Sequence, residues 1–281
     1  MTRISPKNTQ YFPSPESKGG WQFLQKKMDR GVVARMSGEH LNKVIEEYKL
    51  FFDNVASGIV IVKDGFLVKE HYGFMTLPGS RFDVWSCTKS FTGIAWGLLL
   101  EESKNGTLPD NIKVDLDSFA YSFFPDSFKM TDKRKEKITI GHLLSMTSGI
   151  PGENELVFGI PPLDNSGPFE HALGYMENRY GYKTDQLISE PGTIWDYSDP
   201  AMAHLSILFK LIMRREMHEY MQEKVFDKIG IENASWDVHG GGQFIGPHTS
   251  AHVGLHISAR ELARVGYLLM QNGKWGDDEV V

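Results

Sequence analysis

The sequence predicts a mixed α/β protein of the α+β kind, in which a small antiparallel sheet is flanked by helices and a mainly helical region is inserted. Three observations support this: an amphipathic helical segment near the N-terminus, two β-branched runs joined by a turn, and a long stretch dominated by helical patterns. Strands and helices do not alternate regularly, which argues against a doubly wound nucleotide-binding fold. The length of 281 residues allows one large domain or two interleaved subdomains.

The first elements are a helix and a hairpin. Apolar side chains recur at helical spacing in residues 38–53, which predicts one buried helix face. Residues 57–62 and 66–72 are strand-like and surround Asp64-Gly65, a dipeptide typical of a tight hairpin turn. A hairpin cannot bury its face alone, and the rest of the chain offers no good further strand. We therefore expect the sheet to be incomplete in this chain.

Helical patterns follow the hairpin. Gly106 is a stop signal for the first of these helices, and Ser258 is an N-cap candidate for the last. The expected helices span residues 90–103, 139–146, 169–180, 202–215, 216–228 and 255–272.

We expect four regions along the chain. Residues 1–36 are rich in Pro, Gly, Ser and Lys and are predicted to form an extended surface arm. Residues 37–105 form the first part of the α/β region, with the helix that carries the candidate nucleophile. Residues 106–250 form the mainly helical region, and residues 251–281 return to the α/β region, which is expected to be truncated.

Composition and charge exclude several classes of protein. The net charge of −6 argues against nucleic-acid binding, and the run 133–135 (Lys-Arg-Lys) is predicted to be a solvated loop. No apolar stretch reaches the roughly 18 residues that span a bilayer, and the N-terminus has no secretory h-region. The single cysteine, Cys87, excludes an intramolecular disulfide. These features predict a cytoplasmic protein without a membrane partner.

The most informative segment contains the only Ser-x-x-Lys of the chain, Ser86 to Lys89. If Ser86 opens a helix, the two side chains share a face and the lysine amine can reach the serine hydroxyl. A serine becomes a good nucleophile only when a nearby base takes its proton. The alternative is an N-cap serine followed by a surface lysine. A cation in the first helical turn opposes the helix dipole, which weakens that alternative.

A second segment, residues 195–200 (Trp-Asp-Tyr-Ser-Asp-Pro), lies on a loop before a predicted helix. A tyrosine close to a lysine can act as an acid or a base, so Tyr197 is a candidate third catalytic group. The alternative is a packed loop tyrosine.

Together these segments resemble the serine β-lactamase and penicillin-binding-protein superfamily, whose Ser-x-x-Lys signature is well defined. The closer likeness is to the class C branch, with its Tyr-x-Asn element. Residues 138–149 and 254–264 resemble further family segments, and residues 11–21 resemble the 6-aminohexanoate-dimer hydrolase subgroup. The resemblance covers nearly the whole chain, in family order.

The resemblance implies a cofactor-free serine hydrolase of small esters or amides. Ser86 would be acylated, Lys89 and Tyr197 would share the proton transfers, and Trp195 and Asp199 would contact the substrate. Asp199 departs from the family's Asn, and an ionised carboxylate cannot donate a hydrogen bond. That departure puts β-lactam recognition in doubt.

The family's third element is also missing from the pattern. His252-Val253-Gly254 and Lys274-Trp275-Gly276 fit its letters, but the first is predicted to lead into a helix and the second into a turn. We therefore expect this chain to correspond to the N-terminal two-thirds or so of a family member.

Other functions remain open at this point. A binding or sensor protein on the same fold, acylated without turnover, is the main alternative. His248, His252 and His256 recur every fourth residue, but Gly254 argues against the helix that a shared metal site would need. Cys87 is expected to be a small packed residue. The sequence predicts neither the oligomeric state nor the substrate; the aromatic residues that fit either a pocket wall or the core are Phe158, Phe169, Trp236 and Phe244.

Overall fold

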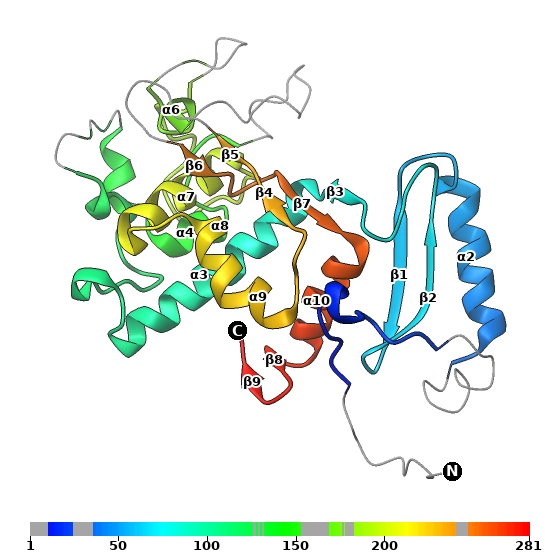
Figure 1. Ribbon diagram of the computed structural model, residues 1–281. Coiled ribbons are helices and arrows are strands. Elements are labelled where there is room, and N and C mark those ends of the chain that lie inside the picture. The colour runs from blue at the N-terminus through cyan, green and yellow to red at the C-terminus, as the bar shows by residue number, and fades with distance from the viewer. Residues whose placement is uncertain are drawn as a thin grey trace. The chain divides into compact units, whose positions relative to one another are not determined.

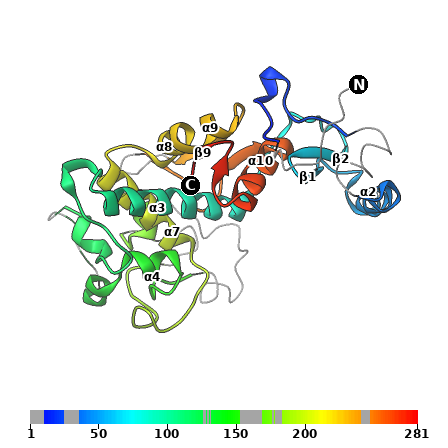
Figure 2. The same ribbon diagram turned by 90° about the horizontal axis from the view of Figure 1, so that it is seen from below.

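The computed structural model describes residues 11–24, 36–125, 128, 130, 132–152, 169–175, 177, 183–239 and 247–281. The chain divides into two compact units (Figures 1 and 2). Unit 1 comprises Met1–Asp83, Gln222–Ser235 and His256–Val281, and unit 2 comprises Val84–Met221 and Trp236–Leu255.

Unit 1 is built on the predicted hairpin. Strands β1 (Gly58–Lys63) and β2 (Phe66–Tyr72) pair antiparallel, with a bulge at Ile61/Val62. Asp64 and Gly65 both have positive φ, 50° and 83°, as a two-residue hairpin turn of this hand requires. The hairpin is confirmed as predicted.

A helix covers each face of this hairpin (Figures 1 and 2). Helix α2 (Gly38–Phe52), which Ser37 caps, packs along β2, and helix α10 (Ala259–Met270) packs along β1. Because strand side chains alternate between faces, each face has its own apolar core. The core on the α2 side contains Leu24, Leu41, Val68, Met36, Ile61 and Phe66, and the other contains Trp21, Leu67, Tyr267, Phe12, Val60, Val62, Ala263 and Trp275.

The described part of the N-terminal arm is an integral part of unit 1. It carries a short 3-10 turn, Glu16–Lys18, and it pairs with β2 through the Leu24 N–H to the Leu67 carbonyl, 3.1 Å. The Arg264 side chain of α10 donates to the Pro13 and Ser14 carbonyls and to Glu16. The arm therefore supplies core and polar contacts, which a loosely attached surface segment would not.

Gly65 provides a direct test of the fit between the arm and the hairpin. A Cβ at Gly65 would stand 1.8 Å from the Tyr11 carbonyl oxygen, and its φ of +83° already disfavours a side chain. We expect Gly65→Ala to lower the free energy of unfolding by about 2 kcal/mol or more, measured by urea titration. Gly79→Ala is the matched control, because its Cβ would meet open space. Equal unfolding midpoints for the two variants would contradict this packing.

The other elements of unit 1 are short. Strand β7 (Leu255–Ser258) lies between β3 (Arg81–Asp83) and β4 (Ser235–Trp236), and β8 (Lys274–Trp275) pairs with β9 (Asp278–Glu279). A π-helical turn, Gln222–Phe226, leads into α9 (Asp227–Ile229). The expectation that no strands follow the hairpin is therefore wrong.

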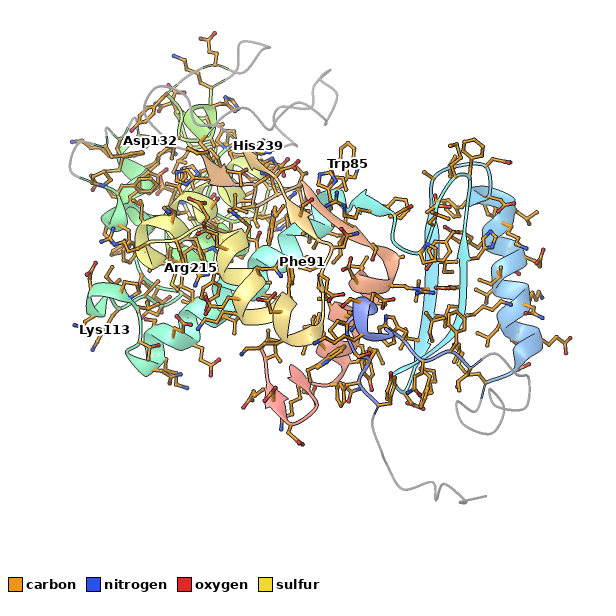
Figure 3. All side chains as sticks on the ribbon, in the orientation of Figure 1. Trp85, Phe91, Lys113, Asp132, Arg215 and His239 are labelled. Carbon is orange, nitrogen blue, oxygen red and sulfur yellow. The ribbon has the colours of Figure 1, made fainter. Side chains whose placement is uncertain are left out.

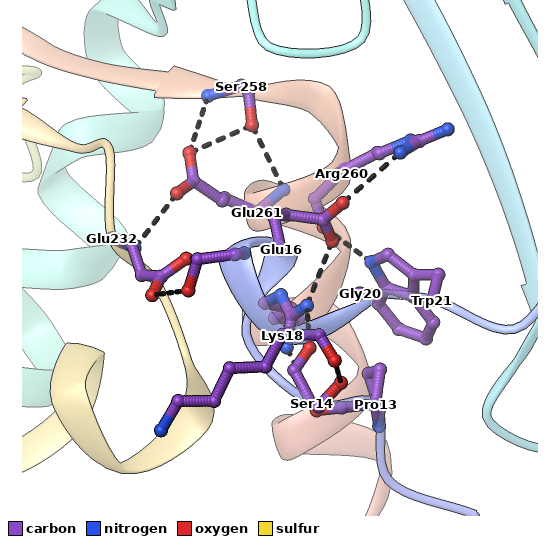
Figure 4. Close-up of polar contacts among 12 residues, drawn as sticks. Pro13, Ser14, Glu16, Lys18, Gly20, Trp21, Glu232, Ser258, Arg260 and Glu261 are labelled. Carbon is purple, nitrogen blue, oxygen red and sulfur yellow. Dashed lines mark hydrogen bonds and ion pairs between the residues drawn. The ribbon is translucent and has the colours of Figure 1, made fainter.

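The start of the last helix is also corrected. Residues 255–258, predicted as helix, form strand β7, which pairs antiparallel with β3 through Phe82 opposite Ile257. Helix α10 begins after Ser258, whose hydroxyl accepts from the Glu261 N–H while Glu261 accepts from the Ser258 N–H (Figure 4). The predicted N-cap is confirmed, and the pairing with β3 explains why the three preceding residues are extended.

Unit 2 is mainly helical, and helix α7 lies at its centre. This helix, Asp199–Met213, is buried on nearly all sides, as expected for a helix at the centre of a bundle. It contacts four others: α3 (Thr88–Asn105), α4 (Ile140–Leu144), α6 (Phe169–Ala172) and α8 (Met217–Met221). Short 3-10 turns span Trp85–Cys87, Pro109–Asn111, Ala120–Phe123 and Lys133–Lys137, and β5 (Val238–His239) pairs with β6 (His248–Thr249).

These helices match the predicted ones with shifted ends. Helix α3 starts two residues earlier than expected and ends at the predicted stop, Gly106, in the left-handed conformation. Helix α7 starts three residues earlier, because Ser198 caps it and Pro200 occupies its first turn. The helix expected at 169–180 is wrong in length, because α6 ends at Ala172 and residues 173–175 form a turn; residues 176 and 178–180 lie outside the described residues.

The run 133–135 was predicted to be a solvated loop, and for Lys135 this is wrong. Lys135 is fully buried and donates to the Thr184 carbonyl, 3.0 Å. Burial lowers the pKa of Lys135 to about 8. Arg134 forms an ion pair with the buried Asp132. Residues 134 and 135 therefore stabilise unit 2 through contacts with other residues of the unit.

Candidate active site

The candidate nucleophile lies in the tight turn that leads into α3. Ser86 is the middle residue of the 3-10 turn Trp85–Cys87, and it is exposed. Trp85, just before it, has a φ of 49°. A bulky residue in this left-handed region is strained by roughly 1–2 kcal/mol. Strain of this kind concentrates at functional sites, where the surrounding structure holds it in place.

Lys89 lies one turn later and contacts four groups of unit 2. Its Nζ donates to Ser86 Oγ at 2.9 Å and to the His252 carbonyl at 3.1 Å. The same nitrogen is 2.7 Å from Asp199 Oδ1 and 4.8 Å from the centre of the Tyr197 ring. The i, i+3 spacing therefore brings amine and hydroxyl together as the sequence predicts. The contacts with Asp199, His252 and Tyr197 then fix the amine in place.

Two threonines of α3 hold the chain that supplies the His252 carbonyl. Thr92 Oγ1 donates to the Ala251 carbonyl at 2.8 Å, and Thr88 Oγ1 accepts from the Leu255 N–H at 3.3 Å. Both threonines are fully buried. Thr88 and Thr92 are one turn apart on the helix, so they anchor the segment on either side of His252.

The loop before α7 positions Tyr197. The buried carboxylate of Asp196 accepts from the Gly152 N–H at 2.7 Å, and the Asp196 N–H donates to the Met146 carbonyl. At Gly152 a Cβ would approach the Tyr197 carbonyl to 2.2 Å, so only glycine permits this contact. Tyr197 itself is half-buried and contacts Lys89 through its ring.

Asp199 is the first residue of α7 and lies directly at the site. Ser198 caps the helix through the Ala201 N–H, which places the Asp199 carboxylate in the first turn, where a negative charge is favoured. Both side chains of the Lys89–Asp199 pair are only 9% exposed. Asp199 therefore places a carboxylate next to the Lys89 amine, at the position where the resemblance predicted an amide.

The candidate aromatic residues differ in how exposed they are. Trp85 and Trp195 are 54% and 58% exposed, and the Trp195 ring lies 6.4 Å from that of Tyr197 (Figure 3 shows Trp85 at the start of α3). Phe169 and Trp236, in contrast, belong to the core. Phe158 and Phe244 lie outside the described residues. In the described part of the chain, Trp85 thus adjoins Ser86 in the sequence and Trp195 lies close to Tyr197, and both rings are exposed.

Three expectations about neighbouring residues change. Cys87, predicted to be packed, is exposed. His252-Val253-Gly254 leads into strand β7 and not into a helix, whereas Lys274-Trp275-Gly276 lies in a hairpin turn as predicted. The role of His252 at Lys89 was missed, because nothing local in the sequence places that carbonyl at the amine.

His248, His252 and His256 do not share a helix face, since His248 lies in β6, His252 in a bend and His256 in β7. Within the described ranges no three His, Cys, Asp or Glu side chains are arranged to hold a metal ion. The helices of these same ranges are all too short or too polar to cross a membrane.

Comparison with known proteins shows which family the sequence matches. The β-lactamase family model matches residues 53–279. Protein flp of Staphylococcus aureus (strain N315) is 24% identical over 198 residues, which cover 66% of this chain and 35% of that protein. The chain therefore spans about a third of the length of this curated relative.

Solved structures share the fold. A Bacillus anthracis protein assigned as a 6-aminohexanoate-dimer hydrolase has a TM-score of 0.60 and 19% identity, covering 96% of this chain and 65% of its own. A β-lactamase/D-alanine carboxypeptidase from Pseudomonas syringae has a TM-score of 0.57 and 17% identity, covering 85% and 67%. The predicted β-lactamase/transpeptidase-like fold is confirmed. Since the family model matches most of the sequence, this protein belongs to the β-lactamase family.

Proposed function

We propose that this protein is a serine hydrolase of small esters or amides, related to the class C β-lactamases, in which Ser86 forms an acyl-enzyme. The observation that carries the proposal is the 2.9 Å hydrogen bond between Lys89 Nζ and Ser86 Oγ, with the lysine fixed by Asp199 and the His252 carbonyl. An exposed serine hydroxyl beside a buried, fully oriented amine is what nucleophilic catalysis requires.

The reaction follows from these positions. In the reactive form, Lys89 and Tyr197 together hold one proton fewer than an ammonium and a phenol. Ser86 Oγ attacks the substrate carbonyl, and its proton moves to that vacant position. The Lys89–Tyr197 pair returns a proton to the departing alcohol or amine as the carbonyl–heteroatom bond breaks. Water then attacks the ester on Ser86 and releases the acid, with the serine proton restored. The Ser86 N–H, in the turn that opens α3, is the candidate donor to the oxyanion.

The substrate contacts are part of the proposal. The exposed rings of Trp85, which precedes the nucleophile in the chain, and of Trp195, which lies 6.4 Å from the Tyr197 ring, are the apolar area that we assign to the substrate. Asp199 acts through Lys89, whose charge it balances, and it presents no amide donor. A substrate that depends on a donor at this position, as we expected for β-lactams, would be a poor one.

Turnover of p-nitrophenyl butyrate tests the proposal. We expect steady release of p-nitrophenol by the wild type, and a loss of about 10³-fold or more in Ser86→Ala, because the nucleophile is gone. Ser90→Ala is the matched control: Ser90 is exposed on the same helix one turn further on, and it should retain the wild-type rate.

The course of the reaction distinguishes the alternatives. A single burst that stops after one equivalent would favour the binding or sensor protein. Equal rates for the wild type and Ser86→Ala would refute the assignment of the nucleophile.

A further inference from the structure

Large apolar side chains are exposed together at one end of unit 1. They come from the last turn of α2 and from the loop that joins β2 to β3 (Figure 1). This set, which we call the apolar end patch, comprises Leu50, Phe51, Phe52, Phe74, Met75 and Leu77. Backbone contacts join its two segments: the Phe74 N–H donates to the Asp53 carbonyl at 2.8 Å, and the Gly73 N–H donates to the Ser57 carbonyl at 3.0 Å. The patch is therefore a surface of fixed shape.

Met75 occupies a backbone conformation that disfavours a methionine. Its φ is 52°, in the left-handed region, where glycine and asparagine are far more common. Its side chain is 86% exposed, so packing within this chain does not offset the strain. A strained apolar residue that is also exposed points to a contact with another molecule.

The patch is also large. Single exposed apolar residues are normal, whereas a contiguous apolar patch of several hundred Å² marks an interaction surface. Taking about 150–250 Å² for a large side chain, the six side chains present on the order of 700 Å² to solvent. A stable protein–protein interface buries about 800 Å² on each partner. The patch therefore supplies most of the area that one side of such an interface needs.

The charge of the patch favours a second copy of this chain as the partner. Residues 50–57 and 73–80 contain one charged side chain, Asp53, and its Oδ1 lies 2.7 Å from Nε2 of His71. In a two-fold contact the same surface lies on both sides, so a charged patch repels its own copy and an uncharged one does not. An anionic membrane surface would be recognised by a cluster of Lys or Arg, and these two segments contain neither.

We propose that the apolar end patch is the interface of a two-fold homodimer, in which Phe51 and Met75 of each copy pack against the patch of the other. Burial of apolar area drives the association. The inference uses residues of unit 1 alone and does not depend on the proposed serine hydrolase.

Sedimentation equilibrium of the 281-residue protein tests this inference. We expect a monomer–dimer equilibrium with a Kd in the micromolar range or below. Phe51→Glu should raise the Kd about tenfold or more, because it places like charges on both sides of the contact. The amides of residues 50–57 and 73–77 should exchange with solvent more slowly above the Kd than below it.

Met270→Asn is the matched control. Met270 is 77% exposed at the end of α10. That end of α10 lies near the hairpin turn, since the Tyr267 hydroxyl is 3.0 Å from the position of a Cβ on Gly65. The patch adjoins the opposite end of the hairpin, at Gly73. The Kd of Met270→Asn should therefore equal that of the wild type.

Met75→Asn separates association from folding. Asparagine tolerates the left-handed conformation, so its urea midpoint, measured below the Kd, should equal or exceed that of the wild type. The Kd should nevertheless rise about tenfold, because an apolar contact is lost from both sides. If Phe51→Glu does not fold, Met75→Asn decides.

Three outcomes would overturn the inference. A wild type that is still monomeric at roughly 100 μM shows that the patch confers no useful affinity between copies. A dimer whose Kd is unchanged in Phe51→Glu and in Met75→Asn is formed by another surface. Binding of a monomer to phosphatidylcholine vesicles, without self-association, would assign the patch to a lipid surface.

Discussion

Replacing Lys89 with methionine is expected to lower kcat for p-nitrophenyl butyrate by about 10³-fold, within the range of general acid–base effects. The Lys89 amine hydrogen-bonds Ser86 Oγ at 2.9 Å. Methionine keeps the apolar length of the side chain and removes the amine. Lys104→Met, on the exposed last turn of the same helix, is the control and should retain activity.

A second variant separates catalysis from stability. Lys89→Met leaves the buried Asp199 carboxylate without its counter-charge, which should cost about 3–5 kcal/mol of unfolding free energy. Lys89→Met/Asp199→Asn removes both charges, so we expect urea titration to show most of that stability regained. Turnover should remain low in both. If the double variant recovers stability and activity together, Lys89 has only a structural role.

The second large effect is expected in unit 1, at Arg264. This arginine is 0% exposed, and it donates to the carbonyls of Pro13, Ser14 and Ile229 and to Glu16. Arg264→Met would leave these acceptors unpaired. Because Glu16 is partly exposed, we expect a cost of about 3 kcal/mol, at the lower end for a broken buried pair.

Hydrogen exchange locates this effect. If Arg264 fastens the arm to α10, the Leu24 and Leu67 amides, which join the arm to β2, should exchange faster in Arg264→Met. Lys228→Met, at an exposed position of α9, is the matched control. Unchanged exchange at residues 11–24 in Arg264→Met would contradict this role.

The elements that the sequence predicted well depend on local signals. The hairpin follows from two β-branched runs around Asp64-Gly65, and the N-cap of α10 follows from Ser258. The pairing of Ser86 with Lys89 was predictable for the same reason, since it depends only on helical spacing.

The failures depend on partners far away in the chain. Residues 255–258 are extended because β3, more than 170 residues earlier, pairs with them. Lys135 is buried because carbonyls of a later loop accept from its amine. Likewise, Asp199 and His252 meet at Lys89 only after α7 and the β6–β7 bend have packed on α3. No periodicity or motif in the sequence predicts these long-range contacts.

The most direct test of the account is the site of covalent labelling. The protein is incubated with a fluorophosphonate, digested and analysed by tandem mass spectrometry, with Ser86→Ala and Ser90→Ala in parallel. The account predicts a single adduct on Ser86, absent in Ser86→Ala and present in Ser90→Ala. An adduct on another residue, or no adduct while ester turnover proceeds, would contradict the assignment of Ser86 as the nucleophile.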